Sequence, residues 1–336
     1  MEFLANYGLF LTKTVTIVAL FIVVLVVLAA LREKQKGQQQ GELTILNIND
    51  KLEEMKDTLE AQWLDKAARK ERAKEKKKRE KEIAKLDTPP ARPRLFVVNF
   101  DGDMRASETE FLREEITAIL QVARPNDEVL VRLESGGGMV HCYGLAAAQL
   151  ARFRDYKINL SIAVDKVAAS GGYMMAAVAN TIMAAPFAIV GSIGVLAQLP
   201  NFHRLLKKYD VDYEQITAGE YKRTLTLFGE NTQKGREKFQ EEIEETHVLF
   251  KDFISHYRPQ IDLAKVATGE HWYGQQAIDL HLVDNLITSD DYLLQKSQQA
   301  DIYEVMYEYK TTISDKLSTY IQSNVKKVFQ YFYSKY

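Results

Sequence analysis

Short apolar runs alternate with longer amphipathic stretches from about Arg94 onwards, and this alternation constrains the fold more than any other feature. The apolar runs are rich in Val, Ile, Leu and Phe and are bounded by Gly, Pro, Asn and Asp, which is typical of strands. Strands that alternate with helices along a chain form a sheet covered by helices, so we predict an α/β domain. Its predicted strands are 95–100, 129–133, 158–164, 181–185, 190–197 and 213–217, and its predicted helices are 108–122, 140–153, 174–179 and 234–258.

A long apolar run near the amino terminus predicts a membrane anchor over residues 1–32. Val15–Leu31 contains no charged residue, and Leu9–Leu11 extend the apolar stretch beyond Lys13. About 20 apolar residues span a bilayer as a helix. A cleaved signal peptide is the alternative, but Glu2 weakens the positive region of such a peptide and no small-residue cleavage site ends the run. The pattern therefore favours an uncleaved, single-pass transmembrane helix.

The charges that flank this helix leave its orientation open. Arg32, Lys34 and Lys36 follow the helix, whereas only Lys13 and the amino terminus precede or interrupt it. Positively charged flanks tend to stay in the cytoplasm, which would place the rest of the chain there. Long domains cross the membrane largely regardless of such charges, so this pattern does not determine the side.

Residues 33–93 are predicted to form a polar linker and a basic helical stalk. The run 66–85 is dense in Lys and Arg, with four Glu and several Ala between them, which favours a solvated helix. Contact with anionic lipid headgroups is a second interpretation of these charges. A nucleic-acid arm is disfavoured, because acidic residues interrupt the run, no aromatic residue is available to stack on bases, and the net charge is −2. Three prolines end the stalk, namely Pro89, Pro90 and Pro93.

The cysteine and histidine content excludes several kinds of site. Cys142 is the only cysteine, so neither an intrachain disulfide nor a multi-cysteine metal site is possible. No two of the six histidines have the close helical spacing of a metal site. The glycine turn at 136–138 lacks the Gly-Lys-Ser/Thr ending of a nucleotide-binding loop. We therefore predict no metal and no cofactor.

Three glycine-rich segments at predicted strand ends are the candidates for chemistry. Consecutive glycines after Ser135 let backbone N–H groups point into a cavity, as in an oxyanion hole, although a plain tight turn explains this segment equally well. Ser170 has only Ala and Gly beside it, which leaves its hydroxyl accessible to a substrate carbonyl. A serine before a helix is more often an N-cap, and this alternative stays open for Ser170 alone. The third segment, Gly191–Val195, adds a second hydroxyl at Ser192.

These segments and their order resemble the signal peptide peptidase A family of serine peptidases, in particular its single-copy members with an amino-terminal membrane helix. The resemblance covers roughly residues 94–287, and it implies a fold related to Clp protease and crotonase, built from stacked β–β–α units. The chain departs from the family at Gly136, where many members have Pro, and at Glu134, where Asn is commoner. The matching elements are Ser135-Gly136-Gly137-Gly138, Ala168-Ala169-Ser170-Gly171-Gly172-Tyr173, Gly191-Ser192-Ile193-Gly194-Val195, Gly219-Glu220-Tyr221-Lys222, and Gly274-Gln275-Gln276-Ala277 followed by Leu282-Val283-Asp284.

The resemblance implies a role for five residues. Ser170 would be the nucleophile and Lys222 the general base, with Ser192 as the hydroxyl that hydrogen-bonds the lysine amine. The N–H groups of Gly137 and Gly171 would form the oxyanion hole. A lysine amine has an ordinary pKa of about 10.4, so a lysine that acts as a base needs burial, which lowers the pKa by up to about 3–5 units.

The resemblance also implies the organisation and partners of the protein. Residues 94–300 are predicted to form the peptidase domain, and 301–336 a carboxyl-terminal strand and an amphipathic helix. Substrates would be signal-peptide remnants or other unfolded or membrane-derived peptides, and the location would be a bacterial inner membrane, with the catalytic domain in the periplasm. The serine and the lysine come from adjacent units in the family, so a one-copy chain would form a homo-oligomer with shared active sites.

Two other functions and one other catalytic arrangement are consistent with parts of the sequence. A crotonase-like acyl-CoA hydratase or isomerase would use the glycine turns for a thioester oxyanion, but it needs neither Lys222 nor Ser192. A catalytically inactive membrane scaffold would be expected to lose Ser170 or Lys222, and both are present. A Ser–His–Asp arrangement with Asp165 stays open, because spacing alone does not exclude it.

Overall fold

The structure is a computed structural model that describes residues 7–18, 20–21, 41–65, 67–72, 74–75, 78 and 92–309. It has two compact units, of which the larger is Thr44–Met306 and the other comprises Met1–Leu43 with Tyr307–Tyr336. No helix within the described residues is both long and apolar enough to cross a membrane. Most of the predicted anchor from residue 19 onwards, the prolines at 89 and 90, and the helix predicted after residue 309 lie outside the described residues.

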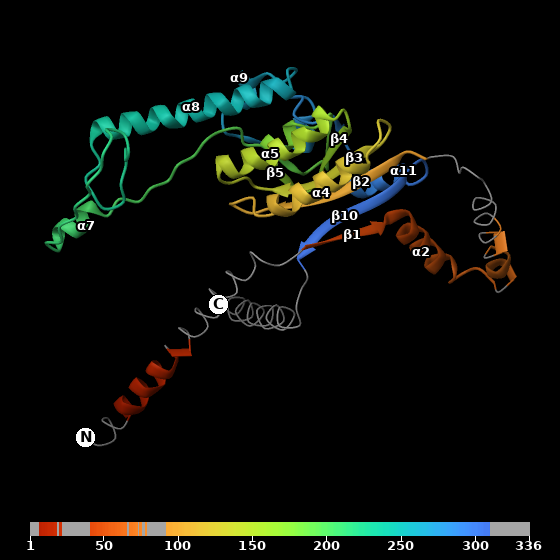
Figure 1. The fold of residues 1–336 in the computed structure, drawn as a ribbon, viewed down its shortest axis with the longest axis horizontal. Coiled ribbons are helices and arrows are strands. Elements are labelled where there is room, and N and C mark those ends of the chain that lie inside the picture. Colours follow the sequence, from red (N-terminus) through yellow and green to blue (C-terminus); the bar gives the residue numbers. More distant parts are fainter. Residues whose placement is uncertain are drawn as a thin grey trace. The chain divides into compact units, whose positions relative to one another are not determined.

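The described strands form one sheet of ten strands with a branch (Figure 1). The strands from β10 across to β9 pair in parallel. The branch leaves β3 through β5, continues to β7, and ends at β8, which is antiparallel to β7. The main order is β1(Gly41–Asn47), β10(Asp301–Tyr309), β2(Arg94–Gly102), β3(Glu128–Ser135), β4(Asn159–Val164), β6(Thr181–Ala184) and β9(Asn285–Leu286), and the branch is β5(Val167–Ala169), β7(Ile189–Gly191) and β8(His271–Tyr273).

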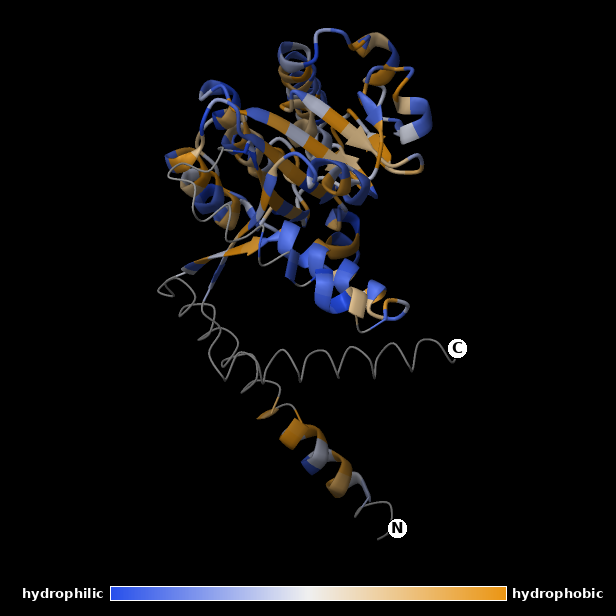
Figure 2. Cartoon of the chain, turned by 90° about the vertical axis from the view of Figure 1, so that its right-hand side faces the viewer, coloured by the Kyte–Doolittle hydropathy of each residue, from blue (hydrophilic) through white to orange (hydrophobic). Residues whose placement is uncertain are grey.

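Helices cover both faces of this sheet, which confirms the predicted α/β class. One face packs against α4, α5, α6 and α8, while the opposite face packs against α2 and α11. Figure 2 shows hydrophobic residues along the central strands, and both hydrophobic and hydrophilic residues on the surrounding helices. The helices are α2(Ile48–Glu60), α4(Thr109–Val122), α5(Val140–Asp155), α6(Gly171–Ala177), α7(His203–Lys208), α8(Gln233–Tyr257), α9(Leu263–Val266), α10(Gly274–Ala277) and α11(Ser289–Lys296).

The two covered faces explain why the central strands are apolar almost throughout. In β2, Phe96 and Val98 point to the α4 and α5 side, whereas Leu95 and Val97 point to the α2 and α11 side. A parallel sheet buried on both faces requires such continuous apolar runs. The short turn from β4 to β5, followed by α6, makes one β–β–α unit of the kind that the resemblance implies.

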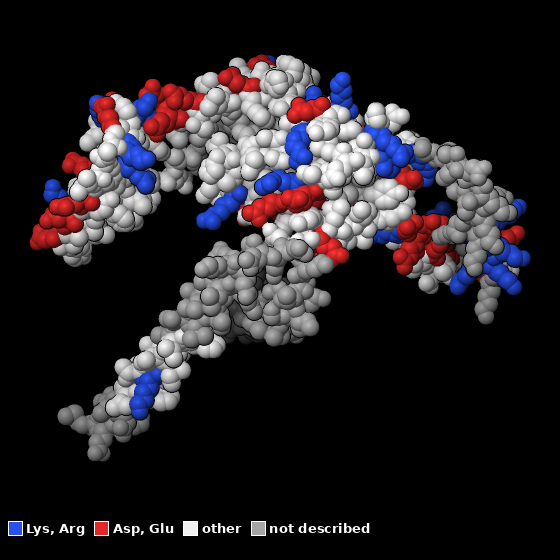
Figure 3. Space-filling model, viewed as in Figure 1, with Lys and Arg blue, Asp and Glu red and all other residues white. Residues whose placement is uncertain are grey.

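The segment 195–232 departs most from the sequence-based expectation. The predicted strand at 213–217 is wrong, because these residues have no regular structure, and Ile216 is 94% exposed. A strand needs a neighbouring strand for its backbone hydrogen bonds, and none of the described strands pairs with this stretch. In Figure 1 the segment carries α7 at the end of α8 that lies farther from the sheet, and Figure 3 shows acidic and basic side chains intermixed there.

β1 and α2 lie in the range that the sequence assigns to the polar linker. β1 extends the sheet beside β10, and Ile48 at the start of α2 is buried against the second face of the sheet. Asn47 caps α2 by accepting hydrogen bonds from the N–H groups of Asn49 and Asp50. Part of the linker range is therefore folded against the sheet. The described residues of the basic run, 67–72, 74–75 and 78, are helical.

Candidate active site

The three glycine-rich segments meet because the strands before them are neighbours in the branch of the sheet. Ser135 at the end of β3 is paired with Ala168 in β5, and Ala169 is paired with Gly191 at the end of β7. The carboxyl ends of adjacent parallel strands lie at one edge of a sheet, where α/β proteins usually place their ligands. The glycine turn, Ser170 and Ser192 therefore follow adjacent strand ends.

Ser170 occupies a strained position between β5 and α6. Its φ of 53° and ψ of −118° lie in a region that favours glycine, and such a conformation costs of order 1–3 kcal/mol. It stands at the N-cap position of α6, yet its side chain makes no capping hydrogen bond. Its backbone N–H donates to the carbonyl of Gly191 at 2.8 Å. The strain therefore serves no capping role, and the hydroxyl has no hydrogen-bond partner among the described residues.

The glycine turn after β3 packs directly against Ser170. A Cβ on Gly137 would lie 2.7 Å from the carbonyl oxygen of Ala169 and from Cβ of Ser170, and 2.8 Å from the nitrogen of Gly171. Gly137 also has a φ of +86°, so no other residue fits here without strain. The N–H of Gly137 donates to Oγ of Ser135 at 3.0 Å. An incoming oxyanion would therefore compete with Ser135 for this donor.

Tyr143 connects the glycine turn to the helix that follows Ser170. Its hydroxyl lies 2.5 Å from Oγ of Ser135 and donates to the carbonyl of Asp103 at 2.7 Å. Its ring lies against Gly171, where an added Cβ would approach the ring to 2.4 Å. Burial raises the pKa of the Tyr143 hydroxyl, so this group stays a neutral donor. One buried side chain thus supports both predicted oxyanion donors.

Ser192 is the third residue of this edge, directly after β7. Its φ of 51° is again positive, and its N–H donates to the carbonyl of Glu270 at 2.7 Å. Its hydroxyl has no hydrogen-bond partner among the described residues. Ala169 and Gly191 are paired in the β5–β7 register, so the residues that follow them, Ser170 and Ser192, lie beside each other. Both hydroxyls are therefore available to a group that enters this edge.

Lys222 lies elsewhere in the chain, on the exposed segment 195–232. Its backbone N–H donates to the carbonyl of Gly219 at 3.2 Å, which closes a turn with Gly219 at a φ of +97°. Its side chain is exposed, and no hydrogen bond joins its amine to Ser170 or Ser192 within the described part of the chain. The structure of one chain thus brings together four of the five predicted site residues and leaves Lys222 apart.

The alternative triad has no geometric counterpart. The carboxylate of Asp165 accepts hydrogen bonds from the N–H and the hydroxyl of Ser289, at 2.8 Å and 2.5 Å. No histidine side chain is hydrogen-bonded to Ser170 or Asp165 within the described ranges. Among these residues there is also no group of three His, Cys, Asp or Glu side chains that could hold a metal ion.

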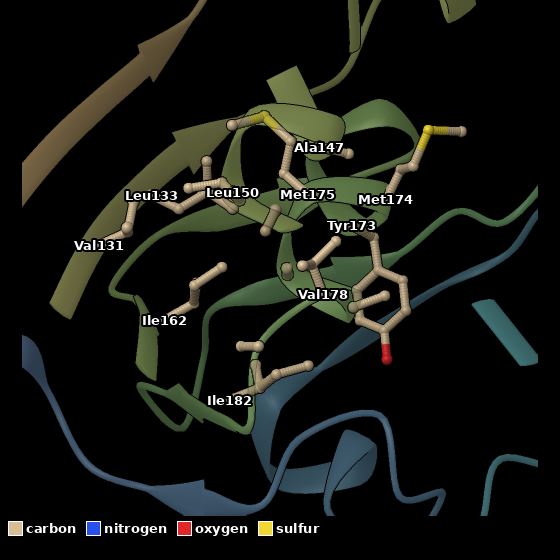
Figure 4. Packing of buried hydrophobic residues seen from close by; sticks show 14 of the residues in the cluster. Val131, Leu133, Ala147, Leu150, Ile162, Tyr173, Met174, Met175, Val178 and Ile182 are labelled. Atoms are coloured by element: carbon tan, nitrogen blue, oxygen red, sulfur yellow. The ribbon is translucent and has the colours of Figure 1, made fainter. Parts of the chain in front are cut away.

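Three residues that hydrogen-bond around this edge were not among the predicted site residues, namely Ser135, Tyr143 and Tyr173. Tyr143 and Ser135 stand beside the glycine turn, and their spacing alone does not show that they bond each other. Tyr173 of the serine segment is fully buried, and its hydroxyl points away from the apolar cluster and donates to the carbonyl of Leu282 at 2.8 Å (Figure 4). Tyr173 ends one of the family motifs and Leu282 begins another, and this was the sequence signal that could have indicated the contact.

The chain matches known peptidases over nearly its full length. Residues 2–150 match the N-terminal region of peptidase family S49, and residues 152–303 match peptidase family S49 itself. The chain is 49% identical over 325 residues to the probable protease SohB of Haemophilus influenzae, covering 94% of this chain and 92% of that protein. It is 43% identical over 339 residues to the probable protease SohB of Buchnera aphidicola subsp. Acyrthosiphon pisum, covering 100% of both. These matches confirm the predicted family: the chain belongs to peptidase family S49 and is a serine peptidase, a hydrolase.

Proposed function

We propose that the chain is a membrane-anchored serine endopeptidase in which Ser170 is the nucleophile and Lys222 the general base. The observation that carries this proposal is the conformation of Ser170 at the edge formed by β3, β5 and β7: its backbone is strained, and its hydroxyl neither caps α6 nor has a hydrogen-bond partner among the described residues. Backbone strain of this kind persists only where the surrounding structure enforces it, and it is concentrated at functional sites.

The arrangement accounts for each step of peptide hydrolysis. The amine of Lys222 takes the proton of the Ser170 hydroxyl as Oγ attacks the substrate carbonyl, and the N–H groups of Gly137 and Gly171 stabilise the oxyanion. The protonated lysine then gives its proton to the leaving amine, which leaves an acyl-enzyme on Ser170. A water molecule, deprotonated by the same lysine, then attacks the acyl carbon, and the protonated lysine returns this proton to Oγ as the C–Oγ bond breaks, which releases the acid and restores the serine. Ser192 would orient the lysine amine by a hydrogen bond.

Three variants test the dyad. Ser170→Ala should abolish casein cleavage and labelling by a serine-reactive phosphonate, and Lys222→Ala should be nearly inactive. Ser255→Ala is a matched control, because Ser255 is exposed on α8 away from the predicted site, and it should retain wild-type activity. Cleavage at the wild-type rate by Ser170→Ala, or full activity of Lys222→Ala, would refute the assignment.

We further propose that the active site is shared between chains, with Ser170 from one protomer and Lys222 from the next. A lysine in water is protonated at neutral pH and cannot act as a base, so an exposed Lys222 needs cover from outside its own chain. The segment around it also exposes large apolar side chains, including Leu196 at 79% and Ile216 at 94%. A head-to-tail contact that buries this segment would close into a ring.

Mixing two inactive proteins tests the shared site. Ser170→Ala and Lys222→Ala, combined under conditions of verified subunit exchange, should recover part of the wild-type activity, because some junctions join an intact serine to an intact lysine. Neither protein should recover activity when it is taken through the same exchange protocol alone. Full exchange without any recovery would show that each chain builds its own dyad.

The location and substrates that we propose are supported by the apolar run and by the family resemblance rather than by the fold. The uncharged run Val15–Leu31 supports a single-pass anchor in a bacterial inner membrane, with lipid as its partner. A site of this kind at a membrane would act on signal-peptide remnants or other unfolded or membrane-derived peptides. Release of the full-length protein by alkaline carbonate extraction of membranes would contradict the anchor, and protease protection in spheroplasts and inverted vesicles would establish the side of the domain.

A further inference from the structure

The turn that carries Lys222 is docked on the first turns of α8. The carboxylate of Glu220, two residues before Lys222, forms an ion pair with Nζ of Lys234 at 2.5 Å. The ring of Tyr221 lies under two ammonium groups, with Nζ of Lys234 at 5.8 Å and Nζ of Lys238 at 5.7 Å from the ring centroid. Lys234 and Lys238 are one helical turn apart on α8 and thus both face the turn.

The backbone of α8 is adapted to the same contact. A Cβ on Gly235 would lie 2.4 Å from the carbonyl oxygen of Thr224, so only glycine lets the chain after Lys222 approach this closely. Thr232 caps the helix by accepting a hydrogen bond from the N–H of Gly235 at 3.1 Å. The position of the Lys222 turn is therefore set by the start of α8.

Among acidic residues, Glu220 is the nearest to Lys222 in the sequence, and this docking holds its carboxylate on α8. A carboxylate beside a lysine amine favours the protonated form, which is inactive as a base. We propose that Lys234 is a positioning residue that holds the Glu220 carboxylate on α8 and thereby prevents it from pairing with Lys222. The inference rests on the proposed role of Lys222 as the base.

The other charged groups around this contact are compatible with the assignment. Arg223 follows Lys222 in the turn, and Lys234 and Lys238 of α8 lie over the ring of Tyr221. The Tyr221 side chain is itself hydrogen-bonded to Glu220, but as a neutral group it does not compensate the carboxylate charge. Lys238 forms its own ion pair with Glu241 at 2.7 Å, and Glu242 and Glu245 lie near it, so it is not available to replace Lys234. The hydrogen bond from Lys234 lowers the pKa of Glu220, which therefore stays ionised at neutral pH.

Removal of Lys234 should consequently leave an ionised Glu220 without its ion-pair partner, with a hydrogen bond to the neutral Tyr221, and able to pair with Lys222. A charge within about 4–6 Å shifts a pKa by about 1–3 units, and partial solvent screening places the expected effect at the lower end. The rising limb of kcat/KM against pH should move upward by about one pH unit in Lys234→Met, which is about tenfold lower activity at a fixed pH on that limb. Activity on the high-pH plateau should be preserved.

The test compares pH profiles of kcat/KM for full-length protein in detergent, with one fluorogenic peptide as substrate. Glu220→Gln in the Lys234→Met background should return the limb to the wild-type position, and Lys234→Arg should keep it there. Lys265→Met is the matched control, because it removes a lysine from an exposed ion pair with Asp262 on α9, and it should not move the limb.

The outcomes separate this inference from the proposed dyad. A limb that is unmoved in Lys234→Met, or a loss of activity at all pH values that Glu220→Gln does not restore, would overturn the role of Lys234 alone. An active Lys222→Ala protein that keeps the wild-type limb would overturn the dyad and this inference with it. An inactive Lys222→Ala together with a shifted and rescued limb would establish both.

Discussion

The buried ion pair between Arg258 and Asp284 allows the loss of stability on its removal to be predicted in magnitude. Arg258, at the carboxyl end of α8, has a side chain only 3% exposed, and its guanidinium binds both carboxylate oxygens of Asp284 at 2.7 Å and 2.8 Å. Asp284 also accepts a hydrogen bond from the N–H of Ile182 in β6 at 2.7 Å. The pair thus fastens α8 to the sheet at the end opposite to Lys234.

Asp284→Ala would leave the buried guanidinium with neutral acceptors alone among the described residues, the carbonyl of His281 at 3.1 Å and the side-chain oxygen of Gln260. Removal of one partner of a buried ion pair costs about 3–5 kcal/mol. Because the Asp284 side chain is 32% exposed and water can reach its place, we expect about 3 kcal/mol. The control Lys265→Ala breaks an exposed pair with Asp262, leaves Asp262 as the N-cap of α9, and should cost less than about 1 kcal/mol.

Urea unfolding of the full-length protein, followed by tryptophan fluorescence, measures this difference through the midpoint of the transition. The double variant Arg258→Met with Asp284→Ala should be more stable than Asp284→Ala alone, because it removes the uncompensated buried charge. Equal stability of the single and the double variant would show that the buried charge is not the cause. A loss below about 1 kcal/mol in Asp284→Ala would refute the reasoning as a whole.

Two further predictions concern the glycine turn and the response to acid. Gly137→Ala should lower casein cleavage by at least about a hundredfold, as loss of an oxyanion donor does, and should also lower the thermal midpoint. The control Gly144→Ala in α5, where an added Cβ meets nothing within 4 Å, should leave both quantities nearly unchanged. A fully active Gly137→Ala would contradict the packing of this turn. Burial raises the pKa of Asp127, but hydrogen bonds from Arg94 and from the N–H of Arg124 outweigh it and leave the pKa below 3.8. The stability from these bonds is therefore complete above that value and is lost as the pH falls through the lowered folded pKa, so Asp127→Asn should destabilise the chain at neutral pH but much less in strong acid. Urea midpoints measured against pH check this, and a loss that is constant with pH would contradict it.

The sequence by itself determined the parts of this protein that depend on local pattern. The apolar runs of β2, β3 and β4 identified strands buried on both faces, and the amphipathic period of α8 identified that helix almost to its ends. The glycine-rich segments and their order identified the family, because the residue types needed at a tight turn or beside a nucleophile are visible in the sequence. These features depend on residues that are close together along the chain.

Only the tertiary structure decided which distant segments meet. The register of β3, β5 and β7 brings Gly137, Ser170 and Ser192 to one edge, and no local pattern specifies this pairing. The stretch 213–217 has a strand-like composition but no neighbour to pair with, whereas β1, which was assigned to a linker, finds one in β10. Ser170 makes no capping hydrogen bond, although an N-cap was the open alternative, and its backbone has a φ of 53° rather than the extended conformation usual for a capping residue. Glu220 likewise forms its ion pair with Lys234, fourteen residues away in the chain. A charged side chain pairs with the partner that the fold brings within reach, which need not be its neighbour in the sequence.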